Sequence, residues 1–250
     1  MLSDDSIKIL RDEVDAYWVN ELGCHNKYYY DMAVGKEGGH QLGDKVDQLS
    51  TGLVTTTHPS EAGFQHKNGK VSPRSMGDFW FKNDNGEWNP INVKTGLVGS
   101  EGQPNIVSLK RVMSSIIEHT IDAYYLLMVK FEIDSKKQTL THNVYLTDIL
   151  DWLSLPRGGS VVTFNSGPGQ TMLKGKMFYD LLSEGFSPGK IDIRKKMELL
   201  MNLYLEGEKN LIRDRERDRK KFESHYNAFK NDSSPFFIDK QKQIGLEIYL

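Results

Sequence analysis

The sequence is poor in cysteine, in proline and in long apolar runs. Its 250 residues include one cysteine, Cys24, and eight prolines. A single thiol cannot form a disulfide within the chain, and no neighbours complete a zinc-ligand spacing around it, so both kinds of scaffold are excluded. No segment approaches the roughly 18 apolar residues of a membrane helix, and the charged start has no apolar signal segment. We therefore expect a soluble, cytoplasmic protein without a membrane partner.

The chain also lacks an excess of charge of either sign. Its 32 Lys and Arg residues stand against 34 Asp and Glu residues, which gives a net charge of −2. A polyanionic partner would therefore need a local basic face. Hydrophobic residues make up 38 %, with 4 Trp, 11 Tyr and 11 Phe, so the chain can build a core and is not disordered as a whole. The length predicts a single domain over residues 1–250.

Residue periodicity and turn signals predict helices and strands in mixed order. The predicted strands are 78–82, 87–94, 122–133, 140–147 and a short one at 161–164. The predicted helices are 6–22, 43–52, 106–119, 176–184 and a long C-terminal one at about 190–227. A polar stretch at about 55–77, rich in Gly, Pro and Ser, predicts a long loop that is mobile or functional. The pattern predicts an α/β fold with a central mixed β-sheet flanked by helices.

The most informative segment is a predicted hairpin around the turn residues 84–86, Asp-Asn-Gly. A two-residue turn would put Asp78 opposite Val93, and its polar side chains would not meet. A three-residue loop with a glycine bulge instead puts Asp78 opposite Asn92. Because side chains alternate along a strand, Lys94 then shares the face of Asn92. In the second register, an acid, an amide and an amine converge.

Such a group of side chains can serve a hard divalent cation. Carboxylate and amide oxygens suit Mg²⁺, and a bound cation can activate a water that attacks phosphorus. Lys94 would orient or deprotonate that water, or meet the charge that develops on the phosphate. The alternative is a hairpin with three polar residues on a solvent-facing side, and the spacing alone does not decide between the two.

Three segments in this order resemble one family. Gly77-Asp78-x13-Asn92-Val93-Lys94-Thr95 resembles the signature of PD-(D/E)XK nucleases. The segment 102–108, GQPNIVS, is similar to a loop-to-helix step of HincII-like and HpaI-like type II restriction endonucleases, and 167–171, GPGQT, resembles the recognition loop of the EcoRV-like branch. The resemblance covers about residues 40–225 and implies a restriction-endonuclease-like core.

The resemblance also implies an activity and its partners. It implies a homodimer from a restriction-modification system that makes Mg²⁺-dependent double-strand cuts at a short, palindromic DNA sequence and leaves 5′-phosphates. Asp78 and Asn92 would hold the metal, Lys94 would complete the catalytic set, and the loop at 55–77 would contact DNA. A nicking or repair nuclease on the same core is an alternative.

The sequence departs from the family at Asn92, where the pattern usually has an acid. Three explanations are open: a naturally tolerated amide, an inactivating Asp-to-Asn change, or an acid supplied from elsewhere. Asp44, Glu61 and Glu87 are candidates for that auxiliary acid, although Asp44 also fits a first-turn helix acid favoured by the helix dipole. A further alternative is a sequence-specific DNA-binding module with an impaired nuclease centre.

The candidate DNA contacts lie in two glycine-rich loops and beside them. Glycine lets the backbone approach DNA, Gln and Asn can pair with base edges, and Lys and Arg can bind phosphate. The candidates are Gln103, Asn105, Asn165, Gly167, Gly169, Gln170, Thr171, Lys110, Arg111 and Lys174. The alternatives are a tight turn at 167–169 and an N-cap role for Asn105. The Arg-Asp-Arg-Glu pattern in 194–221 predicts a solvated helix face that pairs its own charges.

Overall fold

The computed structural model describes residues 2–35, 40–46, 76–82, 88–97, 104–156 and 158–231. It divides the chain into two compact units, Met1–Leu205 and Glu206–Leu250, where the sequence predicted one domain. All the strands belong to the first unit. The predicted loop at 55–77 lies outside the described residues except for its last two positions.

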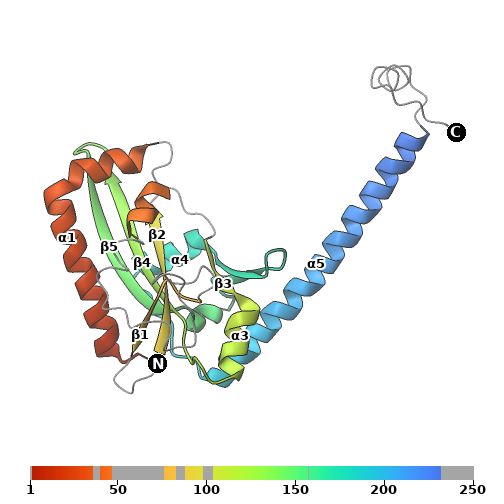
Figure 1. Ribbon diagram of the computed structural model, residues 1–250, viewed down its shortest axis with the longest axis horizontal. Coiled ribbons are helices and arrows are strands. Elements are labelled where there is room, and N and C mark those ends of the chain that lie inside the picture. The colour runs from red at the N-terminus through yellow and green to blue at the C-terminus, as the bar shows by residue number, and fades with distance from the viewer. Residues whose placement is uncertain are drawn as a thin grey trace, which may run out of the picture. The chain divides into compact units, whose positions relative to one another are not determined.

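The main sheet of the first unit has four strands in the order β1-β2-β4-β5 (Figure 1). They are β1 (Phe79–Lys82), β2 (Trp88–Leu97), β4 (Tyr125–Asp134) and β5 (Thr139–Asp148). The pairs β1–β2 and β4–β5 are antiparallel, whereas β2 and β4 run parallel. The α/β class, the mixed sheet and its four strands are therefore confirmed.

One face of this sheet is covered by α1 (Asp4–Val34), which runs along β4 and β5 (Figure 1). The helix extends well beyond the predicted 6–22, with a kink at His25. Its buried side carries residues four apart, namely Leu10, Val14, Trp18 and Leu22. The rings of Trp18 and Phe131 pack edge to face, with their centroids 5.0 Å apart. Odd-numbered residues of β4 supply the sheet side of this core, as period-two alternation requires.

A second, three-stranded sheet lies on the other side, in the order β3-β7-β6. Its strands are β3 (Asn105–Ser108), β6 (Val162–Asn165) and β7 (Gln170–Leu173), all paired antiparallel. Only β6 was predicted. The predicted helix 106–119 was wrong at its start, because 105–108 is strand β3, and the candidate loop at 167–171 continues into strand β7 from Gln170. Strands of four residues carry almost no periodicity, so their pairing partners decide their conformation.

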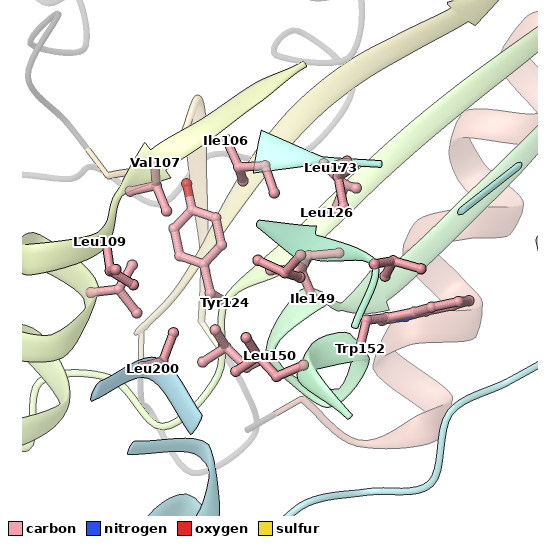
Figure 2. Packing of buried hydrophobic residues seen from close by; sticks show 14 of the residues in the cluster. Ile106, Val107, Leu109, Tyr124, Leu126, Ile149, Leu150, Trp152, Leu173 and Leu200 are labelled. Atoms are coloured by element: carbon pink, nitrogen blue, oxygen red, sulfur yellow. The ribbon is translucent and has the colours of Figure 1, made fainter. Parts of the chain in front are cut away.

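Four further elements complete the core on this side: α3 (Leu109–Ile117), the short 3₁₀ helix η2 (Ile149–Leu153), α4 (Gly175–Ser183) and the start of α5 (Ile193–Lys230). Figure 2 shows Leu109 of α3, Leu150 and Trp152 of η2 and Leu200 of α5 gathered near Tyr124, the residue directly before β4. In α5, Leu200 is fully buried, whereas Met201 and Leu205 are exposed.

The first turn of α5 is attached by a buried ionic group, here called the lysine cluster: Asp148, Asp151 and Lys196. The Lys196 ammonium lies 2.5 Å from Asp148 Oδ2 and 3.1 Å from Asp151 Oδ1. Asp148 Oδ1 accepts hydrogen bonds from the backbone N–H groups of Tyr124 and Leu150. The cluster thus joins β5, η2, α5 and the residue directly before β4.

Candidate active site

The hairpin adopts the register that brings Asp78 and Asn92 together. Phe79 pairs with Ile91 and Trp80 with Pro90, so the next pair in that register is Asp78 with Asn92. The backbone N–H of Asp78 donates to the Ile91 carbonyl at 2.9 Å, which extends the contact to Asp78 itself. The register is the one predicted for the three-residue loop, although the loop residues lie outside the described ranges.

The Asp78 carboxylate is fixed across the hairpin. Its Oδ2 accepts the backbone N–H of Val93 at 2.6 Å. This bond holds the carboxylate against β2, next to the position of Asn92. Asp78 therefore occupies a defined orientation, and it is only partly buried.

Asn92 is buried, with 6 % of its surface exposed. Its Nδ2 donates to the Ile106 carbonyl of β3 at 3.4 Å. Its Oδ1 is buried and has no hydrogen-bond partner within the described part of the chain. The solvent-facing hairpin offered as the alternative is wrong for this residue, because the second sheet covers it. A buried acceptor without a donor costs about 1–3 kcal/mol, so Asn92 Oδ1 keeps the capacity to bind a water, a donor group or a cation.

Tyr124 completes this group, here called the amide cluster: Asp78, Asn92 and Tyr124. The phenol is fully buried, donates to the Met76 carbonyl and points toward β3 in Figure 2. Burial raises the pKa of Tyr124 well above its usual range, and the Asp78 charge raises it further, whereas a hydrogen bond from Asn92 and the charge of Arg111 lower it. The phenol is therefore a neutral donor. Sequence analysis missed Tyr124 because nothing distinguishes it from a core aromatic.

Lys94 and a second lysine lie on the same face of the sheet. Lys94 is half-buried on β2 and pairs with Met128, and the next same-face pair along the strands is Gly96 with Lys130. Lys130 is 7 % exposed, and its ammonium donates to Ser183 Oγ at 2.9 Å. Sequence analysis missed Lys130 because the parallel β2–β4 pairing that brings it close is not encoded in any short motif.

The two candidate DNA-binding loops come together in the second sheet, because Ser108 of β3 pairs with Gln170 of β7. Thr171, however, is 4 % exposed. Its hydroxyl donates to the Val107 carbonyl at 2.8 Å and accepts the Val107 N–H at 3.3 Å. The prediction that Thr171 contacts DNA is therefore wrong for this structure: the hydroxyl is used to join β3 to β7.

The segment between β6 and β7 is a hairpin turn, as its alternative interpretation predicted. Asn165 Oδ1 accepts the Gly167 N–H at 3.2 Å, which fixes the turn from its first side. Gly169 has φ +71°, a conformation that favours glycine. Asn165 and Gly167 are exposed, so the turn can still contact a partner. Gln170 Oε1 is buried without a partner in the described ranges.

The remaining DNA candidates lie around α3 and β7. Asn105 is exposed in β3, and Ser108 occupies the N-cap position of α3, so the N-cap alternative for Asn105 is wrong. The Lys110 ammonium lies 5.2 Å from the centre of the Tyr204 ring. Arg111 is half-buried and Lys174 is exposed. Gln103 lies outside the described residues.

Of the three auxiliary acids, only Asp44 lies in the described ranges; Glu61 and Glu87 do not. Asp44 is exposed on a helical segment at 40–46. That segment packs through Leu42 and Val46 into the core on the α1 side of the sheet. Asn92 occupies the other face, so the packing favours the structural interpretation of Asp44.

Two oxygen donors lie on neighbouring positions of the hairpin, the Asp78 carboxylate and Asn92 Oδ1. Among the described residues there is no group of three His, Cys, Asp or Glu side chains that could hold a metal. Mg²⁺ in phosphoryl-transfer sites is held by one or two carboxylates and completes its shell with water and substrate phosphate. The open Asn92 oxygen beside one carboxylate fits that limited donor set.

Comparison with protein-family models gave no match, and comparison with curated proteins gave none either. Within the helices that the structure describes, none is long and apolar enough to cross a membrane.

Proposed function

We propose that the chain is a Mg²⁺-dependent endonuclease of double-stranded DNA, of the type II restriction endonuclease class and with a restriction-endonuclease-like core. The observation that carries the proposal is the buried, unpartnered oxygen of Asn92 opposite the fixed carboxylate of Asp78. A mixed sheet flanked by helices supports the same class.

The side chains divide the work between them. Asp78 and Asn92 would hold the cation, and the bound cation would supply charge stabilisation at phosphorus and an activated water. Tyr124 accepts a hydrogen bond from Asn92 and so helps to hold the amide in place. Lys94 faces the same side and would orient the attacking water or meet the negative charge of the phosphate.

Sequence recognition is assigned to the second sheet. Its strand β3 accepts a hydrogen bond from Asn92 through Ile106, and its β6–β7 turn exposes Asn165 and Gly167. DNA bound at this turn would be linked to the amide cluster through the pairing of β7 with β3 and the hydrogen bond from Asn92 to β3. A homodimer would apply two such units to a palindromic site and cut both strands.

The test is cleavage of plasmid DNA in Mg²⁺, followed by sequencing of the fragment ends. The chain should produce fragments with 5′-phosphates at one short sequence. Asp78→Asn and Lys94→Ala should each lower the cleavage rate by about 10²-fold or more. Asp180→Asn and Lys176→Ala, exposed partners on α4, are the matched controls and should leave it unchanged.

Failure to cut in Mg²⁺ or Mn²⁺ with any sequence would reject the endonuclease proposal. Nicked circles without linear product would instead favour a nicking or repair enzyme.

A second candidate is a sequence-specific DNA-binding module with an impaired nuclease centre. The amide at position 92 favours it, because a neutral oxygen attracts a cation less than a carboxylate does. Tight duplex binding in Ca²⁺ without cleavage would support this candidate, and restoration of cleavage by Asn92→Asp would identify Asn92 as its cause.

A further inference from the structure

The helix α5 carries a row of exposed apolar side chains. The exposed fractions are 41 % for Met201, 44 % for Leu205, 58 % for Ile212, 74 % for Phe222 and 57 % for Tyr226. Fully burying one such side chain contributes about 1.5–3 kcal/mol, so a row of them exposed on one helix is unusual.

These five residues follow the repeat of a coiled coil. Steps of four and three residues from Met201 to Tyr226 give eight positions along one seam: 201, 205, 208, 212, 215, 219, 222 and 226. The five exposed apolar residues occupy five of them, and the other three are Glu208, Arg215 and Arg219. A seam that is apolar at both ends and charged in the middle favours pairing with another helix.

The charged positions exclude parallel pairing with a second copy of the same helix. In a parallel pair each seam residue meets its own equivalent, so Glu208 would face the partner's Glu208. Arg215 and Arg219 would each meet an arginine in the same way. Three like-charged layers in one seam would each be destabilising.

One antiparallel register removes all three of these like-charged layers. Met201 then faces the partner's Tyr226, Leu205 faces the partner's Phe222, and Glu208 faces the partner's Arg219. Beside the seam, Lys209 comes next to the partner's Glu216. By two-fold symmetry each of these contacts occurs twice.

The remaining layer of this register is Ile212 with the partner's Arg215, whose aliphatic stem can cover an apolar neighbour. Shifting the register by one heptad either sets Arg215 against the partner's Arg219 or sets charged residues against Met201, Leu205 and Ile212. The pairing with matched charges is therefore specified by the sequence of the seam.

We propose that two copies of the chain associate through an antiparallel coiled coil formed by α5 over residues 201–226, about 38 Å of helix. Within the helix, the ion pairs Arg217–Asp214 at 3.2 Å and Arg219–Glu223 at 3.7 Å are exposed, so they compete only weakly with ion pairs between the two helices. The proposal concerns how two chains meet and does not depend on DNA cleavage.

The first test is the mass of the full-length chain in solution, measured by light scattering over a range of concentrations without DNA. We expect a dimer, twice 28.6 kDa. Glu208→Arg and Arg219→Glu should each weaken the dimer at least about tenfold, because each places like charges in two layers. The double variant Glu208→Arg/Arg219→Glu should restore the dimer. Glu206→Arg, on the same helix but outside the seam, is the control.

The second test fixes the register by cross-linking. In a Cys24→Ser background, Leu205→Cys with Phe222→Cys should give a disulfide-linked dimer on oxidation, and either cysteine alone should give much less.

A monomer at every concentration, or a dimer that ignores the charge reversals, would overturn the proposal. Association that appears only on adding duplex DNA would also overturn it and would assign the helix to DNA.

Discussion

The lysine cluster and the amide cluster are both buried groups of polar side chains in the first unit, and they differ in how completely their atoms are bonded. In the lysine cluster the ammonium bonds two carboxylates, and Asp151 Oδ1 also accepts the Ile191 N–H at 3.0 Å. In the amide cluster Asn92 Oδ1 has no partner among the described residues. Burial is similar, so burial alone does not separate a structural group from a candidate site.

This difference in hydrogen bonding points to different roles for the two clusters. A saturated cluster contributes fixed geometry and has no bonding capacity left for a ligand. A buried acceptor without a hydrogen-bond partner lowers the stability of the fold until a donor or a cation binds it. The lysine cluster therefore has a structural role, whereas the open oxygen of the amide cluster is the feature on which the proposed function rests.

Tyr124 connects the two clusters. Its backbone N–H donates to Asp148 Oδ1 at 3.1 Å, and its phenol lies in the amide cluster. The ionic group thus fixes the backbone from which the phenol supports Asn92.

The largest expected effect comes from removing the cation of the saturated cluster. Lys196→Met leaves Asp148 and Asp151 buried without their counter-ion and should lower the free energy of unfolding by about 3–5 kcal/mol. Its neighbour Lys195 is exposed and pairs with Glu198 at the surface, so Lys195→Met is the matched control and should cost less than about 1 kcal/mol. Urea denaturation measures both. Equal effects would show that the buried cluster adds nothing beyond a surface pair.

The second prediction concerns pH. Burial raises the pKa of Asp148 from 3.8 to about 6, Lys196 opposes the shift, and the nearby Asp151 adds to it. Because the folded pKa lies above the unfolded one, this contribution to stability is complete below pH 3.8 and is lost as pH rises through 6. Burial alone would lower the pKa of Lys196, but the two carboxylates raise it, so the ammonium persists throughout this window.

The contribution of Asp148 is on the order of 2 kcal/mol, and Asp148→Asn should remove it. Unfolding free energies measured between pH 4 and pH 7 should therefore vary less in Asp148→Asn than in the wild-type chain. Asp180→Asn, which changes an exposed acid, should keep the wild-type profile. Identical profiles for all three would contradict the assignment.

The third prediction tests the open cluster. Asn92→Asp places a carboxylate against the Ile106 carbonyl and near Asp78, so without a divalent cation it should lower stability by about 1–3 kcal/mol. Millimolar Mg²⁺ should raise its melting temperature more than that of the wild-type chain, since a cation that binds only the folded state stabilises it. Asn165→Asp, at an exposed turn, is the control. Absence of any Mg²⁺ effect on Asn92→Asp would separate this oxygen from a cation site.

These residues also indicate what the sequence could reveal. The spacing from Asp78 to Asn92 and the glycine turn reduced the hairpin register to two possibilities, because local pairing depends on local sequence, and the structure adopts the one that pairs Asp78 with Asn92. The burial of Asn92 could not be predicted in this way, since it depends on β3, whose four residues resemble the start of a helix. Tyr124 and Lys130 join the face through parallel pairing of β2 and β4, a contact across some thirty residues that no motif records.

The smallest expected effects concern the second sheet, where the buried Thr171 hydroxyl can be compared with the exposed Asn165 amide. Thr171→Val keeps the shape but removes both hydrogen bonds to Val107, leaving two buried backbone groups unpaired. It should lower the free energy of unfolding by about 1–2 kcal/mol, whereas Asn165→Ala should change it by at most about 0.5 kcal/mol. If the β6–β7 turn contacts DNA, the order of the two variants should reverse in duplex binding. Asn165→Ala should then lower the affinity for DNA more than Thr171→Val, measured at a temperature where both variants are folded. Binding that simply follows stability would assign both residues to the scaffold.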